Sequence, residues 1–418
     1  MGRFHHRAVP IVLGAVLIDA IGFGIVLPVL PDLVVVLGKV SLEQATRIAG
    51  YMLAAYSLTQ FIAGPIMGNL GDRFGRRPVL LLSMIAFAID YALMAAAPTL
   101  AWLFVGRLVA GVAGATFGPA NAVLADVTPP EKRGATFGLI GAAFGIGFIL
   151  GPAVGGLLAG LGTRAPFLAA ALLATINAIT IYFLLPETLT ADKRRPFRWR
   201  DANIFGALKP VFHAGGAAPL LLAAFFWILG HNVYPATWAF WAKLSLGWDA
   251  AAIGWSLATT GLAMALTQTF IIGRAIGRFG EPRTAVFGVL VGTLTFFGYA
   301  FAPIPWFVYV LLIFGALQAL AWPSMNAMLS QMTDASHQGA LQGGMSAISS
   351  ISSIIAPLAM TQALAFGADR GYPGGAFLLA AVLALLALVI LLTSVLPRLR
   401  GSARPVTAEA EPSVPLGE

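Results

Sequence analysis

The chain has 418 residues, of which 59% are hydrophobic and only 10% charged, and its formal net charge is +8. A mean hydropathy of +0.86 excludes an ordinary soluble domain. The chain has no cysteine, which excludes a disulfide framework and a thiolate metal site. Alternating strand-type patterning does not occur, so a membrane β-barrel is also excluded. The composition predicts an all-α polytopic membrane protein.

Apolar runs recur along the whole chain, separated by charged residues or by Gly and Pro. Because a helix of roughly 20 residues crosses the hydrocarbon of a bilayer, these runs predict about twelve membrane spans. We place the spans at residues 9–30, 48–70, 78–97, 100–122, 134–160, 166–186, 217–243, 250–273, 283–302, 304–328, 339–366 and 374–397. The first run lacks a small-residue cleavage site, so we interpret it as a retained helix and not as a signal peptide.

The longest break between apolar runs begins at Pro186 and divides the runs six and six. It predicts an N-terminal six-helix bundle at residues 1–186, a cytoplasmic linker at 187–216, a C-terminal six-helix bundle at 217–397 and a disordered cytoplasmic tail at 398–418. The basic run Lys193–Arg200 in the linker is either an amphipathic segment on the anionic leaflet or a solvated loop.

The lysines and arginines predict the orientation in the membrane. With both termini inside, most of them fall on the cytoplasmic side of the predicted spans, which is the usual orientation signal. This asymmetry explains the positive net charge without a nucleic-acid partner. We therefore expect a multi-pass protein of the cell inner membrane with both termini in the cytoplasm.

The loop between the second and third predicted spans, Gly68–Arg77, contains one carboxylate and three arginines. A weakened copy, Gly273–Gly280, occurs at the corresponding place in the second half and is followed by Arg283. One such loop has little meaning alone. Two such loops, at matching places in the two halves of a chain, indicate a transporter whose halves arose by duplication.

Ionisable side chains inside predicted spans are candidates for function, because each costs about 2.5–3.5 kcal/mol on insertion scales. The first half contains Asp19, Asp90 and Arg107, whereas the second half contains only His231. We assign all four to proton coupling, with Asp19 favoured, because an unpaired carboxylate at low dielectric can bind and release a proton. Alternatively, Asp19 is permanently paired with Arg107 or with backbone, and Asp90 lies wetted near the outer interface.

Small and polar residues mark candidate packing and cavity positions. Glycines on one face of the fifth span, together with a helix-bending proline, predict close helix packing beyond generic small-residue contacts; they are Gly138, Gly147, Gly151, Pro152, Gly155 and Gly156. Uncharged polar residues and one aromatic residue are candidates for a substrate cavity, although each alone is more often a helix–helix contact; they are Gln60, Asn121, Asn232, Gln268, Gln318 and Trp227.

The Gly68–Arg77 loop, the Arg107 segment and the Gly138–Gly156 run resemble motifs A, B and C of the major facilitator superfamily. The third motif is typical of the drug/proton antiporter branch of this superfamily. Within that branch, the sequence most resembles the tetracycline/proton antiporters of the twelve-helix type. The resemblance covers residues 8–397 and implies two pseudo-symmetric six-helix bundles. It also implies a cytoplasmic gate latch with Asp126 and Arg107 as charge partners; the latch residues are Gly68, Asp72, Arg73, Gly75, Arg76 and Arg77.

Two departures from the tetracycline exporters concern coupling. Those exporters have a histidine in span 8 and an aspartate in span 9, and this chain has Met264 and Gly292 at these positions. The resemblance therefore supports the antiporter class more than it supports tetracycline as the substrate. His231 is a candidate replacement.

We predict a transporter and not an enzyme: a proton-coupled exporter of small hydrophobic or amphiphilic drugs, tetracycline-type compounds first, working by alternating access. The alternative is an exporter or proton symporter of an endogenous metabolite. We expect no metal site and no cofactor, since the proton gradient supplies the energy, although the drug could carry a chelated divalent cation. The expected partners are a small-molecule substrate, protons and the lipid bilayer, with the protein as a monomer.

Overall fold

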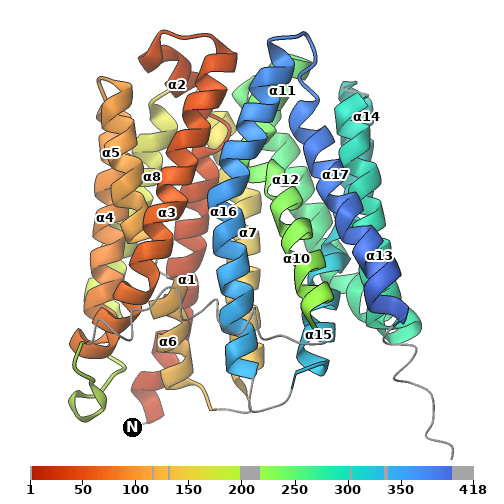
Figure 1. Cartoon of the computed structure of the whole chain (residues 1–418). Coiled ribbons are helices and arrows are strands. Elements are labelled where there is room, and N and C mark those ends of the chain that lie inside the picture. Colours follow the sequence, from red (N-terminus) through yellow and green to blue (C-terminus); the bar gives the residue numbers. More distant parts are fainter. Residues whose placement is uncertain are drawn as a thin grey trace, which may run out of the picture.

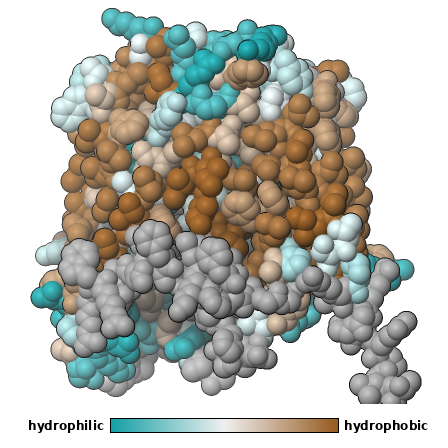
Figure 2. All heavy atoms as spheres, viewed as in Figure 1, coloured by the Kyte–Doolittle hydropathy of each residue, from teal (hydrophilic) through white to brown (hydrophobic). Residues whose placement is uncertain are grey.

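The computed structural model describes residues 2–114, 117–129, 132–197, 217–301, 304–333 and 338–397. These residues form helices and connecting turns, without a strand among them. The long helices run side by side from one end of the molecule to the other (Figure 1). On the face shown in Figure 2, hydrophobic side chains cover the middle of the molecule, between more hydrophilic ends. The predicted all-α polytopic membrane architecture is confirmed.

The first half of the chain contributes eight described helices. They are α1 (Gly2–Val26), the short α2 (Leu30–Gly38), α3 (Leu42–Phe74), α4 (Arg76–Ala96), α5 (Leu100–Ala113), α6 (Phe117–Val127), α7 (Arg133–Ala159) and α8 (Ala165–Leu184). A single turn of 3₁₀-helix, Ala191–Lys193, follows α8.

The second half contains helices interrupted by segments of other helical type. They are α10 (Ala218–His231), α11 (Val233–Leu246), α12 (Ala250–Leu266), a π-helical turn (Thr267–Ile271), α13 (Ile272–Phe301), α14 (Pro305–Gly315), a 3₁₀ segment (Ala316–Leu320), α15 (Ala321–Gln331), α16 (Gln338–Ala368), α17 (Gly375–Ile390) and a second π-helical turn (Leu391–Val395).

Ten described segments are long and apolar enough to cross a membrane. One of them, Ala250–Phe301, has 52 residues, and as a straight helix it would be about 78 Å long against about 30 Å of hydrocarbon. Non-helical dihedral angles at Gly280 divide it into two arms. With these arms counted separately, and with α3 added because its residues 48–70 carry no charge, the described part contains the predicted number of about twelve spans.

The two repeated loops share one backbone conformation. Gly75 has φ 109° and ψ 161°, and Gly280 has φ 75° and ψ 163°. Only glycine adopts this region without strain. Each glycine follows an Arg-Phe pair, at residues 73–74 and 278–279. The weak sequence repeat therefore corresponds to a real structural repeat, and both copies lie at one end of the molecule, here named the basic end.

The two halves of the chain meet along α3 and α16 and along α7 and α12. On α3, a Cβ atom at Gly50 would lie 3.2 Å from the Pro357 carbonyl oxygen of α16. On α7, a Cβ atom at Gly156 would lie 2.7 Å from the Ala250 carbonyl oxygen. Both contacts lie toward the end opposite the basic end, so glycines bring the halves closest together there.

The predicted linker is described only as far as residue 197, and the predicted disordered tail, residues 398–418, lies outside the described residues. The first part of the linker packs against the basic end, since the Arg195 backbone N–H donates to the Asp72 carbonyl oxygen at 3.1 Å. The residue limits of the bundles, linker and tail remain predictions.

Replacing Gly75 with alanine should destabilise the protein by about 1–3 kcal/mol, because a Cβ atom strains this backbone conformation and also meets the Glu187 carboxylate. Gly68→Ala, in the same loop motif, is the matched control, since nothing lies within 4 Å of its Cβ position. The midpoint of thermal unfolding in detergent measures both. Equal midpoints for the two variants would refute the role assigned to the Gly75 backbone.

Candidate functional site

A buried ion pair joins α4 to α5. The Arg107 guanidinium donates to the Asp90 carboxylate, with Asp90 fully buried and Arg107 8% exposed. A Cβ atom at Gly106 would lie 2.7 Å from Asp90 Oδ1, so this glycine provides the space for the carboxylate. The alternative that Asp90 is wetted at the interface is wrong. The pair instead fixes two helices to each other inside the first half.

Gln60 and Tyr56 of α3 extend this cluster. The Arg107 guanidinium lies 5.8 Å from the centre of the Tyr56 ring. Gln60 Nε2 donates to the Gly114 carbonyl oxygen at 2.8 Å, at the point where α5 ends. A carbonyl group freed by a helix end needs such a donor within a membrane. Gln60 therefore satisfies a carbonyl group at the end of α5 and also lines a cavity.

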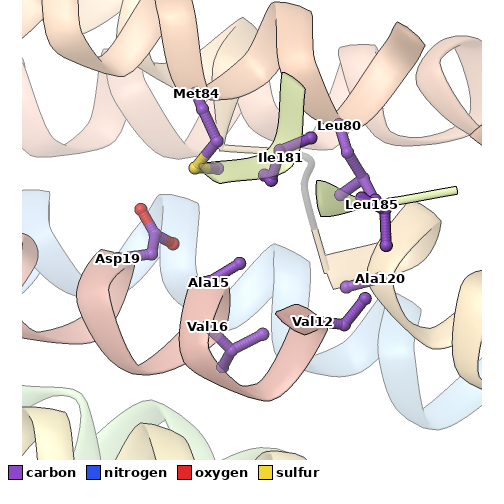
Figure 3. Close-up of a pocket in the computed structure, with 9 residues that line it drawn as sticks. All are labelled: Val12, Ala15, Val16, Asp19, Leu80, Met84, Ala120, Ile181 and Leu185. Carbon is purple, nitrogen blue, oxygen red and sulfur yellow. The ribbon is translucent and has the colours of Figure 1, made fainter. Parts of the chain in front are cut away.

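Asp19 stands apart from this ion pair. It is the only polar residue in the lining of an otherwise apolar cavity between α1, α4, α6 and the end of α8. Figure 3 shows its carboxylate near Met84, with Ala15, Val16 and Val12 following along α1. Within the described residues Asp19 forms no ion pair, and Arg107 pairs with Asp90 instead. Of the two carboxylates predicted to lie inside spans of the first half, Asp90 is thus partnered and Asp19 is isolated.

The second half contains a larger polar cavity of about 410 Å³, a size typical of small-molecule sites. His231 is its only titratable lining residue. The lining is Trp227, Ile228, His231, Asn232, Met264, Gln268, Gln318, Ala319, Trp322, Pro323, Ser349 and Ser353. The structure thus brings together five residues that the sequence analysis had proposed separately. Asn121, also proposed, lies exposed on α6 and lines neither this cavity nor that of Asp19.

Three spans are irregular where they line this cavity. Asn232 separates α10 from α11, Gln268 lies in the π-helical turn, and Gln318 lies in the 3₁₀ segment. Such interruptions often mark functional positions, because irregular backbone at membrane depth is tolerated mainly beside protein or a water-filled cavity. The same three residues also provide polar side chains. The polar character of the cavity therefore comes both from the irregular backbone and from these side chains.

The departures at Met264 and Gly292 have a physical basis. Met264 lines the cavity, and the Trp227 ring occupies the space beside Gly292. A Cβ atom there would lie 2.5 Å from this ring, so an aspartate at position 292 would require Trp227 to move. Gln318, next to the same space, donates from Nε2 to the Tyr234 hydroxyl at 3.0 Å.

Charged residues at the basic end form a second cluster. Arg76 contacts Asp72 at 2.6 Å and Asp126 at 3.4 Å. The Glu187 carboxylate accepts from the Arg76 backbone N–H at 2.9 Å and from that of Arg77 at 3.3 Å, which satisfies free donors at the start of α4. All of these residues belong to the first half and its continuation into the linker.

Three assignments of the sequence analysis are corrected here. Arg73 is exposed and lies against the Phe74 ring, and Arg76 makes the contacts to Asp72 and Asp126 in its place. Arg107 is not a partner of this cluster, because it pairs with Asp90. Gly68 has open space around it and contributes no close packing.

The glycines of α7 act on two faces. Gly147, Gly151 and Gly155 approach α1, where a Cβ atom at Gly151 would lie 2.6 Å from the Ile21 carbonyl oxygen. Gly156 faces α12 in the other half, and Pro152 faces Gly254 of α12. Gly138 has no heavy atom within 4 Å of its Cβ position, so its predicted packing role is wrong.

Two ion pairs join the halves at the end opposite the basic end. Lys243 of α11 lies 2.9 Å from Asp32 of α2, and Arg47 of α3 pairs with Asp369 just after α16. These partners are distant in sequence, so no local pattern could identify them. The same holds for Glu187.

These features define a polytopic membrane transporter of duplicated design, with two helical halves around internal polar cavities. The sequence profile of the Major Facilitator Superfamily matches residues 12–241 and 220–418. The chain belongs to this superfamily.

Relatives and a solved structure agree with this assignment. The chain is 39% identical to the tetracycline resistance protein, class C, of Escherichia coli, over 92% of this chain and 96% of that protein. It is 38% identical to the class G protein of Vibrio anguillarum, over 90% and 94% respectively. The crystal structure of the human organic anion transporter MFSD10 (TETRAN) superposes with a TM-score of 0.70 and 22% identity, over 93% of this chain and 99% of that chain.

Removing one member of the buried pair should be costly. We expect Arg107→Gln to lower stability by about 3–5 kcal/mol, because it leaves the Asp90 carboxylate buried without its counter-charge. The double variant Asp90→Asn/Arg107→Gln should recover most of this loss. The midpoints of thermal unfolding in detergent measure the stability of each variant, and Arg73→Gln, a change at an exposed arginine, is the control. A double variant as unstable as Arg107→Gln would show that the ion pair is not the cause.

Proposed function

We propose that this protein exports small hydrophobic or amphiphilic drugs, tetracycline-type compounds first, in exchange for protons by alternating access. The observation that carries the proposal is the isolated carboxylate of Asp19 in an apolar cavity of the first half. Its support from sequence is the 39% identity to a tetracycline resistance protein over nearly the whole chain. The polar cavity around His231 supplies the space for a substrate of drug size.

The basic end is proposed to face the cytoplasm of a bacterial inner membrane. The charged loops at Gly75 and Gly280 lie there, as does the start of α1 (Figure 1), and positive residues favour the cytoplasmic side. Under this orientation the halves are closed toward the outside by the pairs Arg47–Asp369 and Asp32–Lys243. The conformation is then inward-facing, and both termini are cytoplasmic.

The transport cycle divides the charged residues by role. Asp90 and Arg107 neutralise each other and hold α4 to α5 through the cycle. Asp19 has no such counter-charge, so it takes a proton from the outside once the drug has left, and the neutral form permits the return inward. Proton loss to the cytoplasm and drug binding then favour the outward step. Drug and proton must favour opposite states, because a ligand shifts an equilibrium only through differential affinity.

A second candidate function is export or proton symport of an endogenous metabolite. The observation that favours it is the pair Met264 and Gly292, whose positions carry ionisable residues in the tetracycline exporters that the chain resembles. The cavity of the second half contains only His231 as a titratable group. A substrate whose recognition requires no carboxylate side chain of the second half is compatible with both candidate functions.

The test uses the full chain reconstituted in vesicles. Asp19→Asn should abolish drug-driven proton release and remove drug resistance in an efflux-deficient bacterium, because the amide cannot take up a proton. Asp192→Asn is the control: Asp192 is exposed, and a hydrogen bond from the Thr190 side chain lowers its pKa, so it stays ionised in the assay.

Two outcomes would count against the mechanism. Unchanged proton release by Asp19→Asn would remove Asp19 from the coupling step. Resistance to no drug by the wild-type chain, with export of a metabolite in its place, would favour the second candidate function.

The outer ion pairs give a separate prediction. Because exposed pairs contribute about 0–1 kcal/mol each, Asp32→Asn/Asp369→Asn should shift the population toward outward-open by a few-fold. The chain has no cysteine, so alkylation of Thr361→Cys, packed under Gly50, reports opening. Asp192→Asn, a change at an exposed carboxylate of the linker, is the control. An alkylation rate that rises equally in the control would refute the gating role.

A further inference from the structure

Four serines of α16 lie on one face of the helix. Ser346, Ser349, Ser350 and Ser353 follow the spacing i, i+3, i+4 and i+7, which places side chains in one row. All four line a cavity of about 360 Å³ between α16 and α3, together with Ser57 and Gln60. We name these four side chains the hydroxyl face.

The hydroxyl face connects two cavities. Ser349 and Ser353 line the cavity beside α3 and also the His231 cavity. The face spans seven residues of helix, which is about 10 Å at 1.5 Å per residue. A continuous polar surface therefore runs from the opening beside α3 to Gln318 and His231.

These hydroxyl groups are available for binding. Within the described residues none of the four forms a side-chain hydrogen bond, and Ser346 is exposed. Thr361 on the same helix behaves differently, since its hydroxyl donates to the Pro357 carbonyl oxygen at 2.6 Å. Serines that served only close helix packing would be buried between the helices. Here they remain accessible from the cavities.

Gln318 gives an independent sign of a missing ligand. It lines the same cavity and is 3% exposed. Its Nε2 donates to Tyr234, but its Oε1 is buried without a hydrogen-bond partner among the described residues. A buried acceptor without a partner is costly, so a donor group of a bound ligand would satisfy it.

The charge distribution indicates the part of a substrate that binds here. The linings of the two cavities contain no acidic residue, lysine or arginine. Asp19 and the Asp90–Arg107 pair all lie in the first half. Hydroxyl groups can both donate and accept hydrogen bonds, and Trp227 and Trp322 add aromatic surface. The surface therefore suits an uncharged edge with mixed donors and acceptors.

We propose that the hydroxyl face, with Gln318, binds the uncharged hydrogen-bonding edge of an elongated, planar substrate, and so orients the charged part toward the first half. This inference rests on the proposed drug-export function. The second half then recognises the substrate by hydrogen bonds to a row of hydroxyl groups and not by ionic contacts.

The test compares dissociation constants of tetracycline, measured by calorimetry on the purified full-length protein. Ser349→Ala/Ser353→Ala should bind about tenfold more weakly, which corresponds to about 1.4 kcal/mol. Ser352→Ala is the matched control, because Ser352 is buried on the same helix and lines neither cavity. An analogue with its oxygen edge methylated should bind the wild type and the double variant equally.

The outcomes separate this inference from the proposed function. Equal tetracycline affinity of the wild type and the double variant overturns the hydroxyl face but leaves drug export standing. Absence of binding to the wild type overturns both.

A second measurement covers the case in which the double variant does not fold. Tetracycline should slow the alkylation of Ser350→Cys several-fold and leave that of Gly277→Cys, exposed at the basic end, unchanged. Equal rates with and without tetracycline at Ser350→Cys overturn the inference.

Discussion

Hydrocarbon offers no hydrogen-bond partner, and this constraint governs where polar groups lie in the molecule. Several departures from regular helix have a partner or a cavity beside them. The end of α5 is met by the Gln60 side chain, and the interruptions at Asn232, Gln268 and Gln318 surround one cavity. The breaks in the helices are thus evidence of where the polar interior lies, and they identify it more reliably than any single polar residue.

The two halves share a backbone plan but differ in chemistry. The first half contains an ion pair and an isolated carboxylate, Asp19. The second half has a neutral cavity in which the Trp227 ring fills the space beside Gly292. Duplication preserved the positive-φ glycines at 75 and 280, because they fix chain direction. It left the interior free to diverge, so proton binding and recognition of the uncharged substrate edge are proposed to lie in different halves.

The sequence analysis succeeded where the signal was local or unusual. Apolar length predicted the spans, and the cost of buried charge identified Asp19, Asp90 and Arg107 as exceptional. It failed where the answer depended on which side chains meet. Arg73 and Arg76 have equal charge, and only the turn at Gly75 decides which one faces Asp126. Glu187, Asp32 and Asp369 find partners far away in sequence. The serine spacing on α16 was readable, but small hydroxyl residues are common in spans and give a weak signal.

The glycine faces of α7 have a mechanical consequence. On one side α7 is set against α1 through Gly147, Gly151 and Gly155, and on the other against α12 through Gly156 and Pro152. At both contacts the backbones approach closely, and side chains also take part, since Ala20 lies against Gly147 and Ile149 lies against Gly261 of α12. Under the proposed alternating access, close packing on two sides makes α7 a candidate axis for the relative motion of the halves. A methyl group added at Gly156 would lie 2.7 Å from the Ala250 carbonyl oxygen and would force α7 and α12 apart.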